Sequence, residues 1–484
     1  MKMNMDSRVL VANRLVWWAV VMMVGMSASV SEAGEKDGTD RGRNSWRMAK
    51  HLTKSHTVDV VKSPLSATGR LVGLVADTGI GWVKRLDIRL RRAPLLNRKD
   101  IPELAAGEGM DLEEWSRWLD EEVSLPQTGG EVDFLIDGPA FFERLDAAIE
   151  EATNSILMQT YIFDNDDVAQ ELADRLKDRS AEVDVRVLYD GLGSILAQSV
   201  KPSDTPADHV APRSMHVYLE EGDSKVKVRR IQNAWFAGDH VKSTVIDQRV
   251  AFMGGMNIGR EYRYDWHDMM VELRGPVADL LERVQDRSWR REGLGDLEFI
   301  VGTFRRTEPL QEGAGIHLLR TLPGNGEIAR VQLEAIRRAR HYIYIQNAYF
   351  ADDEIVHELC KARKRGVDVR VILPNRGNHG LMQRSNLLSM NKLVRNGVRV
   401  FHYPGMSHVK AAVFDGWACF GTANYDKLSF RVNKELNIGT FDKDVVDRLL
   451  KSLFLPDMDA SEEVTTKKPV RFVDHVIELV ADEV

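Results

Sequence analysis

One unusual pattern occurs twice in this chain, and the duplication constrains the fold more than any other feature. Each copy has a histidine, a lysine two residues later and an aspartate five residues after the lysine. An asparagine follows, and a carboxylate stands eleven positions after it (257 to 268 and 424 to 435). The two copies are His240, Lys242, Asp247, Asn257 and Asp268, and His408, Lys410, Asp415, Asn424 and Glu435. Background residue usage does not explain two such matching sets.

The sequence around each motif predicts two short strands joined by a tight turn. We expect the turns at residues 247–249 and 415–416, the second being one residue shorter. Side chains two residues apart on a strand share a face, so the histidine and lysine of each motif point the same way. Asp247 and Asp415 fall at the turns and are expected to act as structural ties more than as catalysts.

The repeat extends beyond the motifs. Segments 152–159, 168–179 and 183–187 match 339–346, 355–365 and 367–371 as strand, helix and strand. This order predicts an α/β fold of two pseudo-symmetric halves, with mixed sheets flanked by helices and one active site at the seam. The first half also has a polar, proline-bearing insertion around 203–212, expected as a surface loop that either gates the site or is passive.

The residue types fit displacement at a phosphodiester. This reaction needs a nucleophile, a group that protonates the leaving oxygen, and positive charge at the other oxygens. His240 and His408 suit the first two tasks, with Asp268 and Glu435 each holding an imidazole by its second nitrogen. The phosphate-binding candidates are Lys242, Lys410, Asn257 and Asn424. The candidate catalytic set is His240, His408, Lys242, Lys410, Asp247, Asp415, Asp268 and Glu435.

Both motifs resemble those of the phospholipase D superfamily. Residues 405–426 and 429–435, with 254–259 and 346–350, are similar to bacterial cardiolipin synthases, and this likeness covers about 129–455. It departs at the amino end, where those synthases usually have two membrane spans and this chain has at most one. It departs also at Asp426-Lys-Leu-Ser429, where an arginine commonly precedes the serine.

The resemblance implies a phosphatidyltransferase that passes a phosphatidyl group through a phosphohistidine to an alcohol, with phosphatidylglycerol as its phospholipid substrate. It also favours His240 as the nucleophile and His408 as the acid and base. The alternatives are a phospholipase D that releases phosphatidic acid and an exported phosphodiesterase or nuclease. Two motifs in one chain predict activity as a monomer, with no cofactor.

The chain is expected to divide into five parts. Residues 1–33 have a basic start and an apolar run, which predict a signal peptide or a membrane anchor. Residues 34–128 are a linker and a candidate membrane-associated region, flexible over 34–50. The two halves cover 129–300 and 301–455, and a tail covers 456–484. The expected location is the bacterial periplasm or cell membrane.

Residues 66–99 combine cations with Trp, Ile and Leu. This segment either lies on an anionic bilayer or packs as a helix on the catalytic body. Residues 161–163 and 347–350 carry aromatic side chains that either form a wall for substrate or pack in the core. His267 is either a third catalytic imidazole or only a hydrogen-bonded neighbour of Asp268.

The composition restricts the classes of ligand that the protein is expected to bind. The net charge of −7 argues against general nucleic-acid binding, although it does not exclude a local basic groove. Cys360 and Cys419 are expected as buried thiols. The histidines and cysteines show no zinc-type spacing, so no metal is expected.

Overall fold

The computed structural model of the protein describes residues 38–63, 67, 84–198, 204–234, 237–294, 315–378 and 380–470. The predicted signal peptide or anchor over 1–33 lies outside these ranges. Within them, no helix is both long and apolar enough to cross a membrane.

The first sheet has seven strands in the order β1-β7-β6-β5-β2-β3-β4. Its strands are β1 (Glu131–Ile136), β2 (Ser155–Thr160), β3 (Asp184–Asp190), β4 (Lys227–Ile231), β5 (Ser243–Ile246), β6 (Val250–Gly254) and β7 (Met269–Arg274). The β2, β3 and β4 strands are parallel, whereas β5, β6, β7 and β1 pair antiparallel. The sheet is therefore mixed, as predicted.

The second sheet repeats this arrangement and extends it to nine strands, in the order β16-β12-β11-β10-β13-β14-β15-β8-β9. Its strands are β8 (Ile316–Leu322), β9 (Asn325–Gly326), β10 (Tyr342–Asn347), β11 (Asp368–Pro374), β12 (Arg399–Tyr403), β13 (Lys410–Phe414), β14 (Trp417–Gly421), β15 (Glu435–Thr440) and β16 (Glu462–Glu463). The β10 strand pairs parallel with β11 and antiparallel with β13, just as β2 pairs with β3 and β5. The predicted pseudo-symmetry is confirmed, while the predicted domain limits stay predictions.

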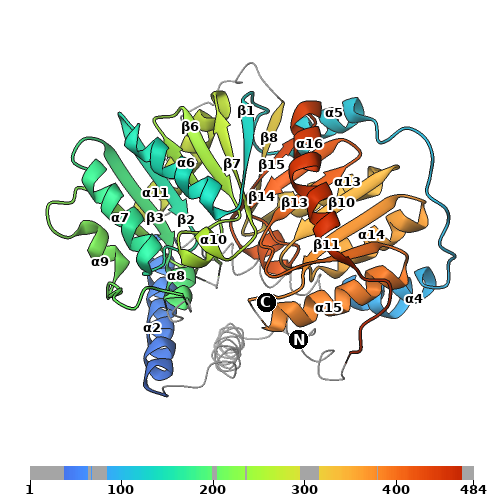
Figure 1. Cartoon of the computed structure of the whole chain (residues 1–484), viewed down its shortest axis with the longest axis horizontal. Helices are drawn as coiled ribbons and strands as arrows, with labels where there is room; N and C mark the ends of the chain where they lie inside the picture. The colour runs from blue at the N-terminus through green and yellow to red at the C-terminus, as the bar shows by residue number, and fades with distance from the viewer. Residues whose placement is uncertain are drawn as a thin grey trace, which may run out of the picture.

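Helices flank both sheets. Figure 1 shows α7 and α9 beside the first sheet and α14 and α15 beside the second. The helices of the first half are α6 (Gly138–Glu150), α7 (Asp167–Arg179), α8 (Gly191–Ala197), α9 (Met215–Glu220), α10 (Arg260–Tyr264) and α11 (Pro276–Leu294). Those of the second are α13 (Glu327–Arg338), α14 (Asp353–Lys364), α15 (Gly380–Arg395), η4 (Leu428–Val432), α16 (Lys443–Leu449), η5 (Leu450–Phe454) and α17 (Leu455–Ala460).

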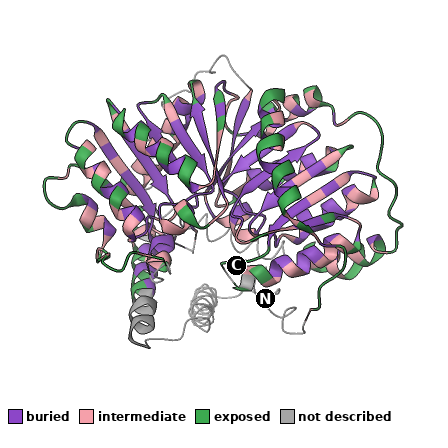
Figure 2. Cartoon of the chain, in the orientation of Figure 1, coloured by how far each residue is buried: buried purple, intermediate pink, exposed green. Residues whose placement is uncertain are grey.

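The two sheets share an apolar core at the seam. Val245 and Val271 of the first sheet belong to the same buried cluster as Val413 and Phe420 of the second. The ring centroids of Phe134 and Phe420 lie 5.5 Å apart, edge to face. Figure 2 shows that the strands are largely buried while the outer helices carry exposed residues. Burial of this apolar area fixes the two halves against each other.

The amino-terminal region differs from the prediction. The expected flexible linker over 34–50 is wrong for its described part, because helix α2 (Gly38–Lys62) begins at Gly38. Met48 and Leu52 of α2 pack with Leu192 of α8. His51 of α2 also lies 2.9 Å from the Oδ1 atom of Asn233. These contacts give the helix an apolar and a polar attachment to the first half, which a polar sequence alone did not reveal.

Part of the 66–99 segment packs on the second half. It continues from residue 84 as a helix through η2 (Ile88–Arg92) and α4 (Ala93–Leu96). Arg89 pairs with Asp353 at 2.8 Å, and Ile88 and Leu96 are buried. Residues 84–96 therefore pack as a helix on the catalytic body, which is one of the two alternatives predicted for this segment. One further helix, α5 (Leu112–Glu122), buries Trp115 beside Trp417.

Other expectations are confirmed. The described part of the insertion, from residue 204 to 212, is mostly exposed. Both cysteines are buried and unpaired by disulfide. Phe163 and Phe350 belong to the core, as one alternative for the aromatic segments stated.

Candidate active site

The motif aspartates close the turns that position each hairpin. Asp247 accepts hydrogen bonds from the backbone N–H groups of residues 153–155, at 2.7 to 2.9 Å. Asp415 accepts from the N–H groups of residues 340–342 and from that of Met110. Asp247 and Asp415 have φ angles of 54° and 47°, in the left-handed region that aspartate tolerates in tight turns. Their geometry is that of ties between the turn and the start of the neighbouring strand.

Each motif histidine is held by a carboxylate of the other half. The Nδ1 atom of His240 lies 3.0 Å from the carboxylate of Glu435. The Nδ1 atom of His408 lies 2.7 Å from Oδ2 of Asp268. Both contacts leave the Nε2 atoms to face a reactant. The sequence predicted that these carboxylates hold the imidazoles, but it did not assign which carboxylate holds which histidine.

Short parallel bridges produce this crossing. The N–H of His240 donates to the carbonyl of Lys434 at 2.9 Å. The N–H of His408 donates to the carbonyl of His267 at 2.7 Å. Each histidine thus lies beside the residue that precedes the opposite carboxylate. The backbone, rather than a flexible side chain, sets the distance between imidazole and carboxylate.

The two motif lysines are buried at the same site. Nζ of Lys242 donates to the carbonyl of His240 at 2.7 Å, and Nζ of Lys410 donates to the carbonyl of His408. Burial lowers the pKa of Lys242 to about 7 and that of Lys410 to about 8, although nearby Glu435 and Asp268 favour the charged forms. A phosphate bound between the lysines would add negative charge and so favour the protonated, charged form of each lysine.

Burial also shifts the pKa values of Asp268 and His240. Burial raises the pKa of Asp268 to about 7, against the opposing effect of Lys410 and the Met269 N–H. Burial also lowers the pKa of His240, and Lys242 adds to this, whereas Glu435 opposes it. His240 is therefore held as a neutral imidazole that donates through Nδ1 and keeps a lone pair on Nε2. This state suits a nucleophile.

The two asparagines differ in their contacts. Oδ1 of Asn257 accepts from the N–H of Ile162 at 3.0 Å, which turns its amide nitrogen away from that contact. Oδ1 of Asn424 is buried and has no hydrogen-bond partner among the described residues. Both asparagines are buried and follow the second strand of their hairpin, Asn257 after β6 and Asn424 after β14.

Aromatic rings surround the histidines. Tyr161 lies edge-on to His240 with 4.7 Å between ring centroids, and Trp266 lies 5.3 Å from His408. Tyr262 and Tyr349 lie 5.9 and 6.2 Å from His408. Tyr161 and Tyr349 therefore line the site, as the other alternative for the aromatic segments expected. Their rings exclude water from the imidazoles, which strengthens the electrostatic interactions there.

Sequence reasoning missed Thr422 and Gly255, which occupy equivalent places in the two copies. The hydroxyl of Thr422 donates to Glu435 at 2.6 Å. A side chain at Gly255 would meet Asp268, because an added Cβ would lie 2.1 Å from Oδ1. The longer carboxylate, Glu435, thus lies beside a hydroxyl, and the shorter one, Asp268, lies beside a glycine. Aligning the two copies position by position would have revealed this paired change.

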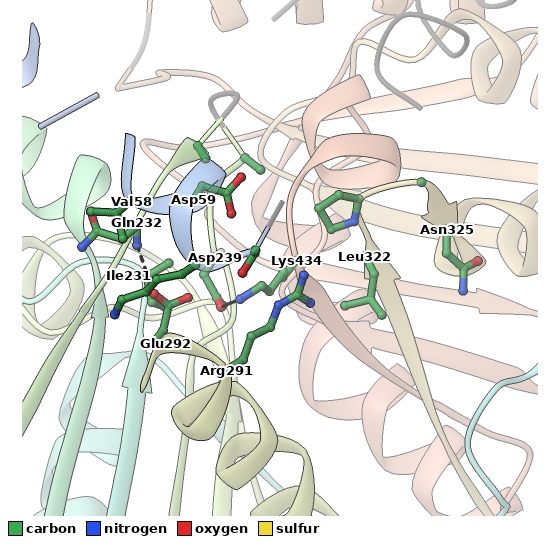
Figure 3. Close-up of a pocket in the computed structure, with 17 residues that line it drawn as sticks. Val58, Asp59, Ile231, Gln232, Asp239, Arg291, Glu292, Leu322, Asn325 and Lys434 are labelled. Atoms are coloured by element: carbon green, nitrogen blue, oxygen red, sulfur yellow. Dashed lines mark hydrogen bonds and ion pairs between the residues drawn. The ribbon is translucent and has the colours of Figure 1, made fainter. Parts of the chain in front are cut away.

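A cavity of about 380 Å³ lies beside Asp239, the residue that precedes His240 (Figure 3). Charged residues line it, among them Asp239, Glu292, Arg291 and Lys434. Lys434 pairs with Asp239 at 2.8 Å, and neither motif histidine contributes to the lining. The cavity therefore adjoins the histidine site without containing it.

The arrangement can perform a two-step displacement at phosphorus. It offers two imidazoles with fixed Nδ1 contacts, two buried lysines and two amides in one place. Among the residues that the structure describes, no group of three histidine, cysteine or acidic side chains could hold a metal ion.

Comparisons with known proteins agree with this geometry. The family described as "Cardiolipin synthase, PLD-like domain" matches residues 145–289 and 333–454. The chain is 31% identical over 395 residues to cardiolipin synthase A of Pseudomonas entomophila (strain L48), covering 73% of this chain and 78% of that protein. It is 30% identical over 392 residues to cardiolipin synthase A of Pseudomonas putida (strain KT2440), covering 73% and 77%.

A solved structure shares the fold. The crystal structure of phosphatidylserine synthase from Haemophilus influenzae Rd KW20 superposes with a TM-score of 0.58 at 13% identity. The match covers 76% of this chain and 96% of that one, so both halves take part in it.

Proposed function

Because the chain belongs to the phospholipase D-like family of cardiolipin synthases and is a phospholipase D-type phosphatidyltransferase, we propose that phosphatidylglycerol is both its donor and its acceptor. The reaction forms cardiolipin and releases glycerol. The observation that carries this proposal is the crossed pair of histidine and carboxylate contacts, which gives one chain two oriented imidazoles. The names of the curated relatives support the choice of product.

In the first step, Nε2 of His240 attacks phosphorus while the bond from phosphorus to the glycerol oxygen breaks. His408 gives its Nε2 proton to that oxygen, and glycerol leaves. The product is a phosphatidyl group bonded to His240. Glu435 stabilises the positive charge that develops on the imidazole, because its carboxylate accepts a hydrogen bond from the Nδ1–H group.

In the second step, a hydroxyl of another phosphatidylglycerol gives its proton to Nε2 of His408 and attacks phosphorus. The bond from nitrogen to phosphorus breaks and His240 is free again. Lys242 and Lys410 stabilise the charge on the equatorial oxygens in both steps. Water in place of the alcohol would give phosphatidic acid, so exclusion of water by the aromatic rings favours transfer.

The protein works at a membrane surface, exported to the periplasm or attached to the cell membrane. The basic and apolar amino terminus supports this part of the proposal. Leu90 on η2 is 75% exposed, and the flanking Arg91 and Arg92 are exposed as well. Exposed leucines among cations suit contact with anionic phospholipid headgroups. Both motifs lie in one chain, which supports activity as a monomer.

Purified full-length protein incubated with phosphatidylglycerol vesicles tests the proposal. Equal amounts of cardiolipin and glycerol are expected. Phosphatidic acid with glycerol and no cardiolipin would show a hydrolase instead. A parallel incubation with single-stranded DNA tests the nuclease alternative, for which no cleavage is expected.

A further inference from the structure

His267 lies between two carboxylates. Its Nδ1 atom is 2.7 Å from Oδ1 of Asp137, and its Nε2 atom is 2.8 Å from Oδ2 of Asp457. A neutral imidazole has only one N–H, so it would turn a lone pair toward one of these carboxylates. Two carboxylate contacts are satisfied only when both ring nitrogens donate. The geometry therefore requires an imidazolium. The ring also stacks on Tyr403 at 4.5 Å between centroids.

This imidazolium joins the two halves beside His408. Asp137 precedes α6 of the first half, while Asp457 belongs to α17 of the second. Asp457 also accepts from Nε2 of Gln346 at 2.7 Å, and the same nitrogen donates to Ser407 at 3.0 Å. The N–H of Asp137 donates to the carbonyl of Asp268 at 2.9 Å. Asp137 thus contacts Asp268 directly, and Asp457 is linked through Gln346 to Ser407, the residue before His408.

Lys434 holds the equivalent place in the second copy. It directly precedes Glu435, as His267 directly precedes Asp268, and its Nζ lies 2.8 Å from Oδ2 of Asp239. Asp239 in turn accepts from Nε2 of Gln159 at 2.8 Å and directly precedes His240. In the copy that contains His408, Ser407 is at the position equivalent to Asp239. Because serine has no carboxylate, Asp457 supplies it. The same contacts recur with different residues.

We propose that His267 and Lys434 are positioning residues, each a largely buried cation that holds the backbone beside one active-site histidine and so keeps the following carboxylate aimed at that histidine. Neither needs to touch the substrate. His267 acts on the pair of His408 and Asp268, and Lys434 acts on the pair of His240 and Glu435.

The charges around His267 support this role. Burial alone would lower its pKa, but the hydrogen bonds to Asp137 and Asp457 outweigh burial and raise the pKa to about 9. The ring is therefore charged at neutral pH. Burial raises the pKa of Asp268 and the charge of His267 opposes this, so that the pKa lies at about 7 with His267 charged. Asp137, Asp457 and Asp268 are the acidic groups that face His267, with Tyr403 stacked on its ring.

Activity as a function of pH tests the proposal, using phosphatidylglycerol vesicles as the substrate. In His267→Gln the positive charge is lost, so Asp268 is protonated at a higher pH. The acidic limb of kcat should move upward by about one pH unit, which lowers kcat at pH 6 about tenfold. His267→Arg restores the charge and should return the limb toward its original pH. An unmoved limb in His267→Gln would overturn the proposal.

His317→Gln is the matched control. His317 of β8 is a buried histidine that contacts one carboxylate, Asp120 at 3.0 Å. Its loss should cost a similar amount of stability without moving the acidic limb. An equal movement of the limb in this control would mean that general destabilisation, and not His267, sets the pH dependence.

NMR of 15N-histidine-labelled protein gives a readout that needs neither substrate nor the glutamine variant. Both ring nitrogens of His267 should be protonated at pH 7, with the signal assigned by its shift in Asp137→Asn. A neutral ring at pH 7 would refute the imidazolium. The kinetic test rests on the proposed function, whereas this one does not. A charged His267 in a protein without transferase activity would refute the function alone.

Discussion

Glu435 lies 3.0 Å from Nδ1 of His240, although 195 residues separate them in the chain. Each motif therefore supplies an imidazole to its own half and a carboxylate to the other. Neither imidazole is oriented without the opposite half, so the active site forms only when the two halves pack together at the seam.

His240→Ala and His408→Ala should each abolish transfer while the fold remains intact. Loss of the general acid alone typically costs on the order of 10²–10⁴ in rate, and loss of the covalent nucleophile costs at least as much. Cardiolipin formation measures the rate, and circular dichroism checks the fold. A mixture of the two variants should stay inactive, since one chain contains both pairs. Recovered activity in the mixture would mean that chains exchange halves.

Activity should survive EDTA. In the proposed mechanism the lysines and amides provide the charge stabilisation at phosphorus, and no cluster of potential metal ligands occurs among the described residues. The rate with phosphatidylglycerol vesicles before and after chelation measures this. Complete loss that one divalent ion reverses would refute the mechanism, whereas a modest change would reflect vesicle packing.

A substrate with an acidic leaving alcohol should identify the nucleophile. Such a leaving group needs little protonation, so His408→Ala should still form the phosphoryl adduct and His240→Ala should not. The neutral state that burial gives His240 agrees with this assignment. Peptide mapping of the trapped protein locates the adduct. A phosphoryl group on His408 in the His240→Ala protein would reverse the two roles.

Gly255→Ala should slow transfer strongly. The new Cβ would lie 2.1 Å from Oδ1 of Asp268 and would displace the carboxylate from His408. Misplacement of about 1 Å can cost on the order of a hundredfold in rate. Gly380→Ala is the control, because no atom lies within 4 Å of its added Cβ. Activity in Gly255→Ala equal to that of the control would contradict the close packing at Asp268.

Lys242→Met should abolish activity and raise the free energy of unfolding. Burial penalises the charged form of Lys242 in the folded state, and an apolar side chain removes that penalty. Burial lowers the pKa of Lys242 to about 7, while an unfolded lysine stays protonated to about 10.5. The unfolded state therefore binds more protons between these values, and stability rises with pH there. Urea unfolding at pH 7 and 9 should show less of this rise in the variant; an unchanged rise would contradict the assignment to Lys242.

Local features of the fold were predictable from the sequence. The strands and turns around Asp247 and Asp415 follow from the apolar pattern and from the residue types that favour tight turns. The repeat itself revealed the pseudo-symmetry. The crossing of His240 to Glu435 was not predictable, because it depends on how the two sheets pack. Both carboxylates stand at the same spacing in their motifs, so spacing could not distinguish a crossed from an uncrossed arrangement.

The missed parts depend on distant contacts. Helix α2 has a polar sequence, and only its attachment to Leu192 and Asn233 distinguishes it from a linker. Asp457 lies outside both motifs, in a helix whose sequence shows no pattern of an active site. Its contact with His267 required the three-dimensional position of α17. Such residues have no counterpart in the other copy, so the repeat could not identify them.

The crossed contacts also determine when the protein becomes active during its synthesis. When His240 emerges from the ribosome, the carboxylate that will orient it lies 195 residues further along the message. The carboxylate for His408 is made 140 residues before that histidine, and it too waits for the second half. A nascent or truncated chain that ends before His408 thus contains no complete pair, and one that ends between His408 and Glu435 lacks the partner of His240. Lipid-modifying chemistry begins only after both halves have been translated and have folded together.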